Sequence, residues 1–118
     1  MQKVFGQFVH EKRMRLLEGD KRFSLRQVAQ RIGIQPSYLS KIERGDQTYL
    51  SEEKILSLAN ELGEDPDVLL ALNGKVSNDI QEIIRKRPQL FAQLIRELKN
   101  MPDNAVLKLV REVRDGDW

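Results

Sequence analysis

The chain has 118 residues, of which 40% are hydrophobic, 32% charged and 6% aromatic, and this suits one soluble helical domain or a small domain with an appendage. It contains no cysteine, which excludes disulfides and thiolate metal sites and is compatible with the cytoplasm. No apolar run approaches the ~20 residues of a membrane span, and no signal-peptide core is expected at the start.

The net charge of +2 conceals an uneven distribution. Residues 1–50 carry ten Lys or Arg against five Asp or Glu, whereas residues 51–118 carry ten against thirteen. A basic N-terminal half is what phosphate binding requires, and the acidic half is a poor candidate for a second nucleic-acid surface.

The first predicted helix runs from about Lys3 to Glu18 and ends at Gly19-Asp20. Its apolar contacts are expected at Phe5, Phe8, Val9 and Leu16. His10 is the only histidine, and one imidazole without a Cys or second His nearby is interpreted as a surface residue, neither metal ligand nor catalytic base.

Residues 23–45, with the sequence FSLRQVAQRIGIQPSYLSKIERG, predict two helices joined by a tight turn. Ser24 is suited to cap the first helix, whose apolar face consists of Leu25, Val28, Ala29 and Ile32. Gly33 can take the left-handed conformation that ends a helix, and Pro36 fits the first position of the next one.

The second of these helices, residues 36–44, has two different faces. Only Leu39 and Ile42 are expected to point inward, and the outside carries Ser37, Tyr38, Ser40, Lys41 and Arg44. Hydroxyls at the start and cations further along suit base edges first and phosphates after. The alternative is an ordinary helical hairpin with a solvated polar face.

Two more short helices follow. Ser51 is the expected cap of the fourth, whose first turn holds Glu52 and Glu53, and whose core face is Ile55, Leu58, Ala59 and Leu62. Neighbouring carboxylates diverge on a helix, so Glu52 and Glu53 do not form a catalytic pair. The fifth begins at Asp65-Pro66, directs Val68, Leu69 and Leu72 inward and ends before Gly74. These helices delimit a first domain at residues 1–74.

Residues 75–118 predict a helical C-terminal extension. A break or kink is expected at Arg87-Pro88, and a last helix from about Pro102 is expected to bury Val106, Leu109, Val110 and Val113. The basic run 85–87 is interpreted as a solvated cluster at a helix end rather than a nucleic-acid patch. An apolar stripe runs along the extension through Ile80, Ile83, Ile84, Phe91, Leu94, Ile95 and Leu98.

The extension is too short for a comfortable core of its own, so its apolar stripe needs a cover. We favour a second copy of the chain, because an exposed stripe of this density is typical of an interface. Packing on the first domain is the alternative. A further alternative is a partner protein bound through residues 79–113.

The pattern A-x-x-x-G-(I/V)-x-P-S-Y-L-S-x-I-E-x-G links residues 29–45 to a known family. The chain matches it at Ala29, Gly33, Ile34, Pro36, Ser37, Tyr38, Leu39, Ser40, Ile42, Glu43 and Gly45. It resembles the phage-repressor class (Xre, or Cro/C1-type) of helix-turn-helix regulators over residues 3–74. The resemblance implies an all-α fold: a five-helix phage-repressor-like DNA-binding domain, here with a short helical C-terminal extension. Residues 14–21 resemble an insertion relative to that family, and would either extend the first helix or form a basic loop beside the DNA.

The same resemblance implies the residues that contact double-stranded DNA. Gln35 and Ser37 would lie near bases or flanking phosphates, Tyr38 at a phosphate or thymine methyl, and Lys41 would read guanine. The residues expected to hold the DNA backbone are Arg44, Gln47, Thr48 and Tyr49 on one flank and Ser24 and Arg26 on the other. One departure from the family is Leu25, which stands where relatives often carry a glutamine that braces the base contacts. For Tyr38 the alternative is a ring that covers the helix pair while only its hydroxyl reaches out.

These observations predict a sequence-specific transcriptional regulator, a repressor by resemblance. It would bind as a homodimer, because one module touches few base pairs and two half-sites about 34 Å apart supply specific affinity. The alternative is an antitoxin-like protein whose C-terminal helices bind a partner protein. No catalytic residue, metal or cofactor is expected. The predicted location is the cytoplasm, at the nucleoid when DNA is bound.

Overall fold

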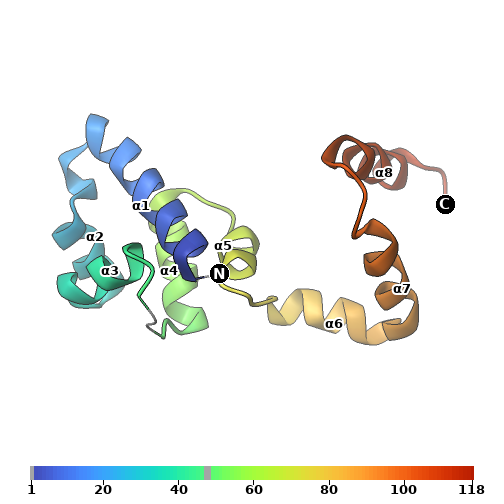
Figure 1. The fold of residues 1–118 in the computed structure, drawn as a ribbon, viewed down its shortest axis with the longest axis horizontal. Helices are drawn as coiled ribbons and strands as arrows, with labels where there is room; N and C mark the ends of the chain where they lie inside the picture. The colour runs from blue at the N-terminus through green and yellow to red at the C-terminus, as the bar shows by residue number, and fades with distance from the viewer. Residues whose placement is uncertain (1, 47–48) are drawn as a thin grey trace. The chain divides into compact units, whose positions relative to one another are not determined.

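The computed structural model describes residues 2–46 and 49–118, and throughout these ranges the chain forms helices and connecting turns without a strand. The all-α prediction is therefore confirmed. The chain divides into two compact units, residues 1–77 and 78–118, which are described separately (Figure 1). None of the described helices is long and apolar enough to cross a membrane.

The N-terminal unit contains the five predicted α-helices and a short 3-10 turn, η1. Their bounds are α1 Gln2–Gly19, η1 Lys21–Phe23, α2 Leu25–Ile32, α3 Pro36–Glu43, α4 Glu52–Leu62 and α5 Pro66–Leu72. Residues 14–19 continue α1, so the alternative of a basic loop there is wrong. Helix α1 continues as far as Gly19. Asp20 then caps η1 by accepting the Arg22 backbone N–H at 2.9 Å, so little of the segment remains to form a loop.

One apolar core holds this unit together. Its buried side chains come from all five helices and from the loop before α4: Phe5, Val9, Val28, Ala29, Ile32, Leu39, Ile42, Leu50, Ile55, Leu58, Ala59, Leu62, Leu69 and Leu70. The prediction that Val68 packs inward is wrong. Val68 is 41% exposed, and the inner face of the short helix α5 is formed instead by Leu69 and Leu70.

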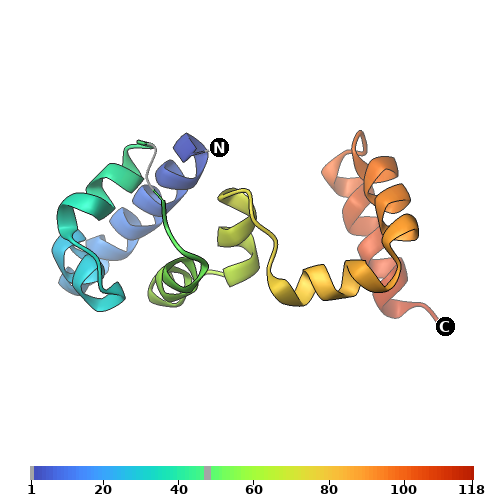
Figure 2. The same cartoon turned by 90° about the horizontal axis from the view of Figure 1, so that it is seen from below.

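Helix α1 runs alongside α3 and is fastened to its C-terminal end (Figures 1 and 2). The guanidinium of Arg13 binds both carboxylate oxygens of Glu43, with Nε–Oε2 2.7 Å and Nη2–Oε1 2.9 Å, and its Nη1 donates to the Phe23 carbonyl at 3.2 Å. Both side chains are almost fully buried. His10 adds a contact of 2.6 Å from Nδ1 to Glu43 Oε1. Because a buried charge needs its partner, this pair fixes the position of α3 against α1.

Gly6 lies where α1 crosses the end of α3. A Cβ at this position would lie 2.2 Å from the Ile42 carbonyl oxygen, which is closer than atoms can approach. The lack of a side chain at Gly6 thus allows two backbones to touch, although glycine is a weak helix former.

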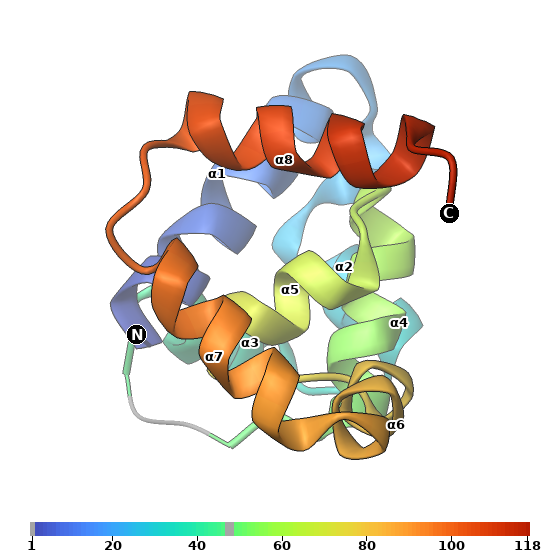
Figure 3. The same cartoon turned by 90° about the vertical axis from the view of Figure 1, so that its right-hand side faces the viewer.

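The C-terminal unit consists of α6 (Asn78–Lys86), α7 (Pro88–Leu98) and α8 (Asp103–Asp115), which Figure 3 shows as three separate helices joined by turns. The predicted break at Arg87-Pro88 is confirmed, since α6 ends at Lys86 and α7 begins at Pro88. No side chain of these three helices is buried, so the prediction that the last helix buries Val106, Leu109, Val110 and Val113 is wrong within this unit, because three short helices do not enclose a core. The large apolar side chains most exposed on the helices are Ile83, Leu90, Leu94, Ile95, Leu107, Val110 and Val113, and Trp118 beyond α8 is more exposed still.

Candidate nucleic-acid interface

The turn between α2 and α3 is held by local hydrogen bonds that the sequence specifies. Gly33 has φ 77°, and the Ile34 N–H donates to the Ala29 carbonyl at 3.0 Å, as in a helix that ends at a left-handed glycine. Lys54 Nζ donates to the Ile32 carbonyl at 2.9 Å, and a Cβ on Gly33 would lie 2.8 Å from that nitrogen. The turn therefore needs glycine for its left-handed conformation, and a side chain there would also displace the end of Lys54.

The first turn of α2 places two of the predicted DNA-contacting residues. Ser24 caps the helix, as predicted, by accepting the Gln27 backbone N–H at 3.3 Å. Its hydroxyl proton is still available to a phosphate oxygen, because a hydroxyl donates once and accepts twice. Arg26 lies on the exposed side of α2 and makes no ion pair among the described residues. Both groups can therefore meet a phosphate without breaking the fold.

Helix α3 begins at Pro36, as predicted, and is preceded by Gln35 at the N-cap position. The Gln35 carbonyl accepts the backbone N–H groups of Tyr38 and Leu39, at 3.0 and 3.1 Å. Its side chain makes no capping hydrogen bond and is exposed. The amide is thus positioned by the backbone yet free to bind at the start of the helix.

The two faces of α3 are separated as the sequence predicted. Leu39 and Ile42 are buried, whereas Ser37, Lys41 and Arg44 are exposed. Ser40 is half-buried and its Oγ accepts from Arg44 Nη1 at 3.1 Å.

The two cations of this face differ in their surroundings. Arg44 Nη2 also contacts Asp46 Oδ2 at 3.3 Å, whereas Lys41 makes no ion pair or side-chain hydrogen bond among the residues described. Lys41 can therefore donate to a new acceptor directly. Arg44 must share or exchange its bond to Asp46, which suits a weaker and less specific contact such as a phosphate.

Tyr38 is half-buried, and its ring packs on the apolar core. Its hydroxyl donates to the backbone carbonyl of Tyr49, whose own side chain is 75% exposed. A phosphate would therefore have to compete with the Tyr49 carbonyl for the hydroxyl proton.

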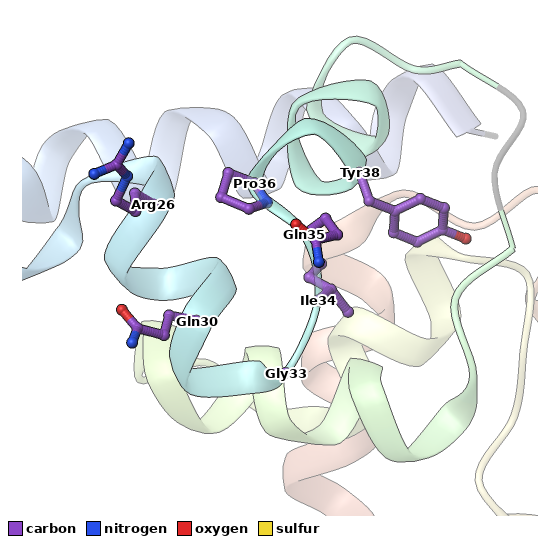
Figure 4. A pocket seen from close by; sticks show the side chains of 7 residues that line it. All are labelled: Arg26, Gln30, Gly33, Ile34, Gln35, Pro36 and Tyr38. Carbon is purple, nitrogen blue, oxygen red and sulfur yellow. The ribbon is translucent and has the colours of Figure 1, made fainter.

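Three predicted residues, Arg26, Gln35 and Tyr38, line one open groove of about 650 Å³ between α2 and α3 (Figure 4). In Figure 4 the Arg26 side chain projects from α2, whereas the Tyr38 ring extends from α3 away from α2. Gln30 also borders this groove, and it was not among the predicted site residues. A signal was present, since Gln30 follows Arg26 by one helical turn on the polar face of α2.

The remaining predicted residues and the surrounding charges complete the site. Gln47 and Thr48 lie outside the described residues. Two acidic groups near the face are already engaged, because Glu43 is buried against Arg13 and Asp46 contacts Arg44. The exposed groups on this side are therefore amides, hydroxyls and cations, which are the donors that phosphates and base edges accept.

Comparison with known proteins agrees with this geometry. The family described as "Helix-turn-helix" matches residues 13–69, which include α2, the turn and α3. No curated protein and no solved structure matches the chain. The chain carries a helix-turn-helix domain of the Xre (Cro/C1-type) family of DNA-binding transcription regulators.

Proposed function

We propose that this protein is a sequence-specific regulator that inserts α3 into the major groove of double-stranded DNA and acts as a repressor. The observation that carries the proposal is the division of α3 into a buried apolar face and an exposed face of Ser37, Lys41 and Arg44. A helix-turn-helix presents its second helix to DNA in this way.

Each exposed group has a role that its chemistry supports. Lys41 would donate to guanine O6 and N7, because its ammonium is exposed and makes no bond within the described fold. Ser37 and Gln35, at the start of α3, would contact bases or the phosphates beside them. The backbone contacts would come from Ser24 and Arg26 on one flank and Arg44, Gln47, Thr48 and Tyr49 on the other.

The C-terminal unit supports a homodimer as the active form. Its three helices bury no side chain, although each carries apolar residues at helical spacing. A second copy would cover these residues and would also bring two copies of α3 to two half-sites. A dimer bound across a promoter would block transcription there, and it would lie at the nucleoid.

The same exposed residues support one alternative. In an antitoxin-like protein, residues 79–113 would bind a partner of different sequence while the N-terminal unit binds DNA. The two proposals differ in the state of the purified chain, which would be dimeric in the first case and would acquire its cover only with the partner in the second.

Selection of bound duplexes from a random pool tests the proposed function. We expect a palindromic motif whose half-sites are one helical turn apart, because symmetry in the DNA mirrors two-fold symmetry in the protein. The same selection with the Lys41→Ala variant shows whether the preference for one base depends on Lys41. Lys99→Ala in the C-terminal unit is the matched control and should select the same motif as the unchanged chain. A pool without enrichment would contradict DNA reading, and a single half-site would contradict the dimer.

A further inference from the structure

Lys75 is a residue of the N-terminal unit that the DNA-binding surface described above does not include. It follows the end of α5, where the positive φ of Gly74, 73°, turns the chain back. The Lys75 backbone N–H donates to the Leu70 carbonyl at 2.8 Å, and Leu70 is itself buried in the core. The backbone of Lys75 is therefore fixed by the cap of α5.

From this position the side chain reaches the segment that leads into α4. Lys75 Nζ donates to the Leu50 carbonyl at 3.1 Å and lies 5.0 Å from the centroid of the Tyr49 ring. Leu50 is buried and Tyr49 is exposed, so the chain passes between surface and core at these two residues, and the Lys75 ammonium contacts both of them. A cation over an aromatic face and a charge-assisted hydrogen bond both favour this arrangement.

The other side of the same segment is held by α3. The Tyr38 hydroxyl donates to the Tyr49 carbonyl, so consecutive carbonyls of Tyr49 and Leu50 accept from two elements that are far apart in sequence. Tyr38 belongs to the helix proposed to enter the DNA, and Tyr49 is proposed to contact the DNA backbone.

We infer that Lys75 is a positioning residue for DNA binding: its ammonium holds Tyr49 beside α3 in the orientation that meets the phosphate backbone. The inference rests on the proposed function. It also places the end of the functional DNA-binding unit beyond Gly74, because a chain cut there would keep every core residue and lose this contact. Lys75 acts through Tyr49 and not through a phosphate of its own.

The test uses the full-length chain with Lys75→Met, which keeps the aliphatic stem and removes the ammonium, and Lys75→Arg, which keeps the charge. We expect Lys75→Met to lower affinity for the selected duplex by about threefold to tenfold, and Lys75→Arg to restore most of it. Thermal unfolding of each variant checks that the fold is intact.

A second background separates positioning from direct contact. In a Tyr49→Ala chain, Lys75→Met should have little further effect, because no ring remains to be positioned. If Lys75 bound a phosphate itself, the loss would persist in that background and the slope of log affinity against log salt would fall by about 0.9. That outcome, or unchanged affinity of Lys75→Met, would overturn the inference.

The contact itself has a signature that does not require DNA. The ε-methylene protons of Lys75 should be shifted upfield by the Tyr49 ring, and Tyr49→Leu should abolish the shift. If the ε-methylene protons of Lys75 were not shifted, the inference would be overturned while the proposed function would stand. If the unchanged chain selected no duplex, the proposed function would fail and the inference with it, even though the upfield shift was present.

Discussion

The two units of this chain contain similar proportions of apolar residues but use them differently. The N-terminal unit buries apolar side chains from all of its five α-helices in one core, whereas α6, α7 and α8 bury none. Both units have helices with apolar residues at helical spacing. The comparison teaches that periodicity predicts a helix with an apolar face, while stability depends on another element that covers this face.

The difference between the units extends to their charges. In the N-terminal unit, Arg13 and Glu43 form a buried pair that joins residues 30 positions apart. The ion pairs recorded within the C-terminal unit, such as Arg85–Glu82 and Arg114–Asp115, join near neighbours on exposed surface. Exposed local pairs contribute little to stability, so they do not substitute for a core.

The largest expected effect concerns the buried pair of the N-terminal unit. Glu43→Ala removes one partner and leaves the Arg13 guanidinium buried without its counter-charge, so the free energy of unfolding should fall by about 3–5 kcal/mol. Glu18→Ala, at an exposed position of α1, is the matched control and should change it by less than about 0.5 kcal/mol. Chemical denaturation followed by circular dichroism measures both, and similar values for the two variants would refute a structural role of the pair.

Features that depend on contacts within a few residues could be predicted from the sequence, and features that depend on contacts between distant segments could not. Ser24, Gly33 and Pro36 specify the helix-turn-helix through contacts within a few residues, and all three behave as predicted. Glu43 belongs to the family pattern, but nothing in the local sequence indicates that Arg13 is its partner. Gly6 was missed for the same reason: a glycine inside a helix is explained only by the backbone that touches it.

The open alternative in α1 and the error in α5 have a related cause. The charged residues of the segment 14–21 suit either a helix or a loop, and the structure continues α1 to Gly19 and begins η1 at Lys21. Val68 and Leu70 are both apolar residues of a short helix, and pattern alone did not indicate which of the two would meet the core. In the candidate site, the outward positions of Ser37, Lys41 and Arg44 could be predicted from α3 alone. The spacing of Gln30 from Arg26 indicates that it shares the polar face of α2, but that this face borders a groove follows only from the packing of α2 beside α3.

The next prediction assigns DNA reading to the N-terminal unit. Lys41→Ala should lower affinity for the selected duplex by about 1–3 kcal/mol and relax the preference at one base pair, because a base-specific hydrogen bond is lost. Arg44→Ala should weaken binding to all duplexes alike and reduce the salt dependence, because it removes a phosphate contact.

Titration of both variants against selected and random duplexes, at several salt concentrations, measures these two effects. Lys99→Ala, in the C-terminal unit, is the control and should retain normal affinity and specificity. If Lys41→Ala lost affinity equally for selected and random duplexes, Lys41 would read no base.

A smaller effect is expected where the C-terminal unit meets its proposed second copy. Leu94 is 44% exposed on α7, and Leu94→Asp should raise the dissociation constant of the dimer by about tenfold or more, because it places a charge in an apolar interface. The unfolding of the N-terminal core should be unchanged. Sedimentation equilibrium over a range of concentrations measures the first effect and denaturation the second.

Gln93→Asp is the matched control, since it adds the same charge at an exposed polar position of α7. We expect it to leave the dimer intact. Equal dissociation constants for the two variants would show that the apolar stripe does not form the interface, and a purified chain that is monomeric at all concentrations would favour the partner-binding alternative.

The smallest expected effect concerns a local pair before α2, and it tests whether such pairs are independent of the other unit. The Arg22 guanidinium, hydrogen-bonded to the Asp20 carboxylate with Nη2–Oδ2 at 2.7 Å, lowers the pKa of Asp20 from its ordinary value of 3.8 to about 2. A carboxyl with a lowered pKa contributes stability that is present above its ordinary pKa and is lost as the pH falls through the folded value, here between about 4 and 2. Because Asp20 and Arg22 are at the surface, solvent screens the pair and the effect on stability should be small.

A titration of the Asp20 carboxyl carbon by nuclear magnetic resonance should give a midpoint near 2, and Arg22→Ala should return it toward 3.8. Arg114→Ala, which removes the neighbouring-residue pair of α8, should leave this midpoint unchanged, because the two pairs belong to separate units; a shift would mean that the units influence each other's charges.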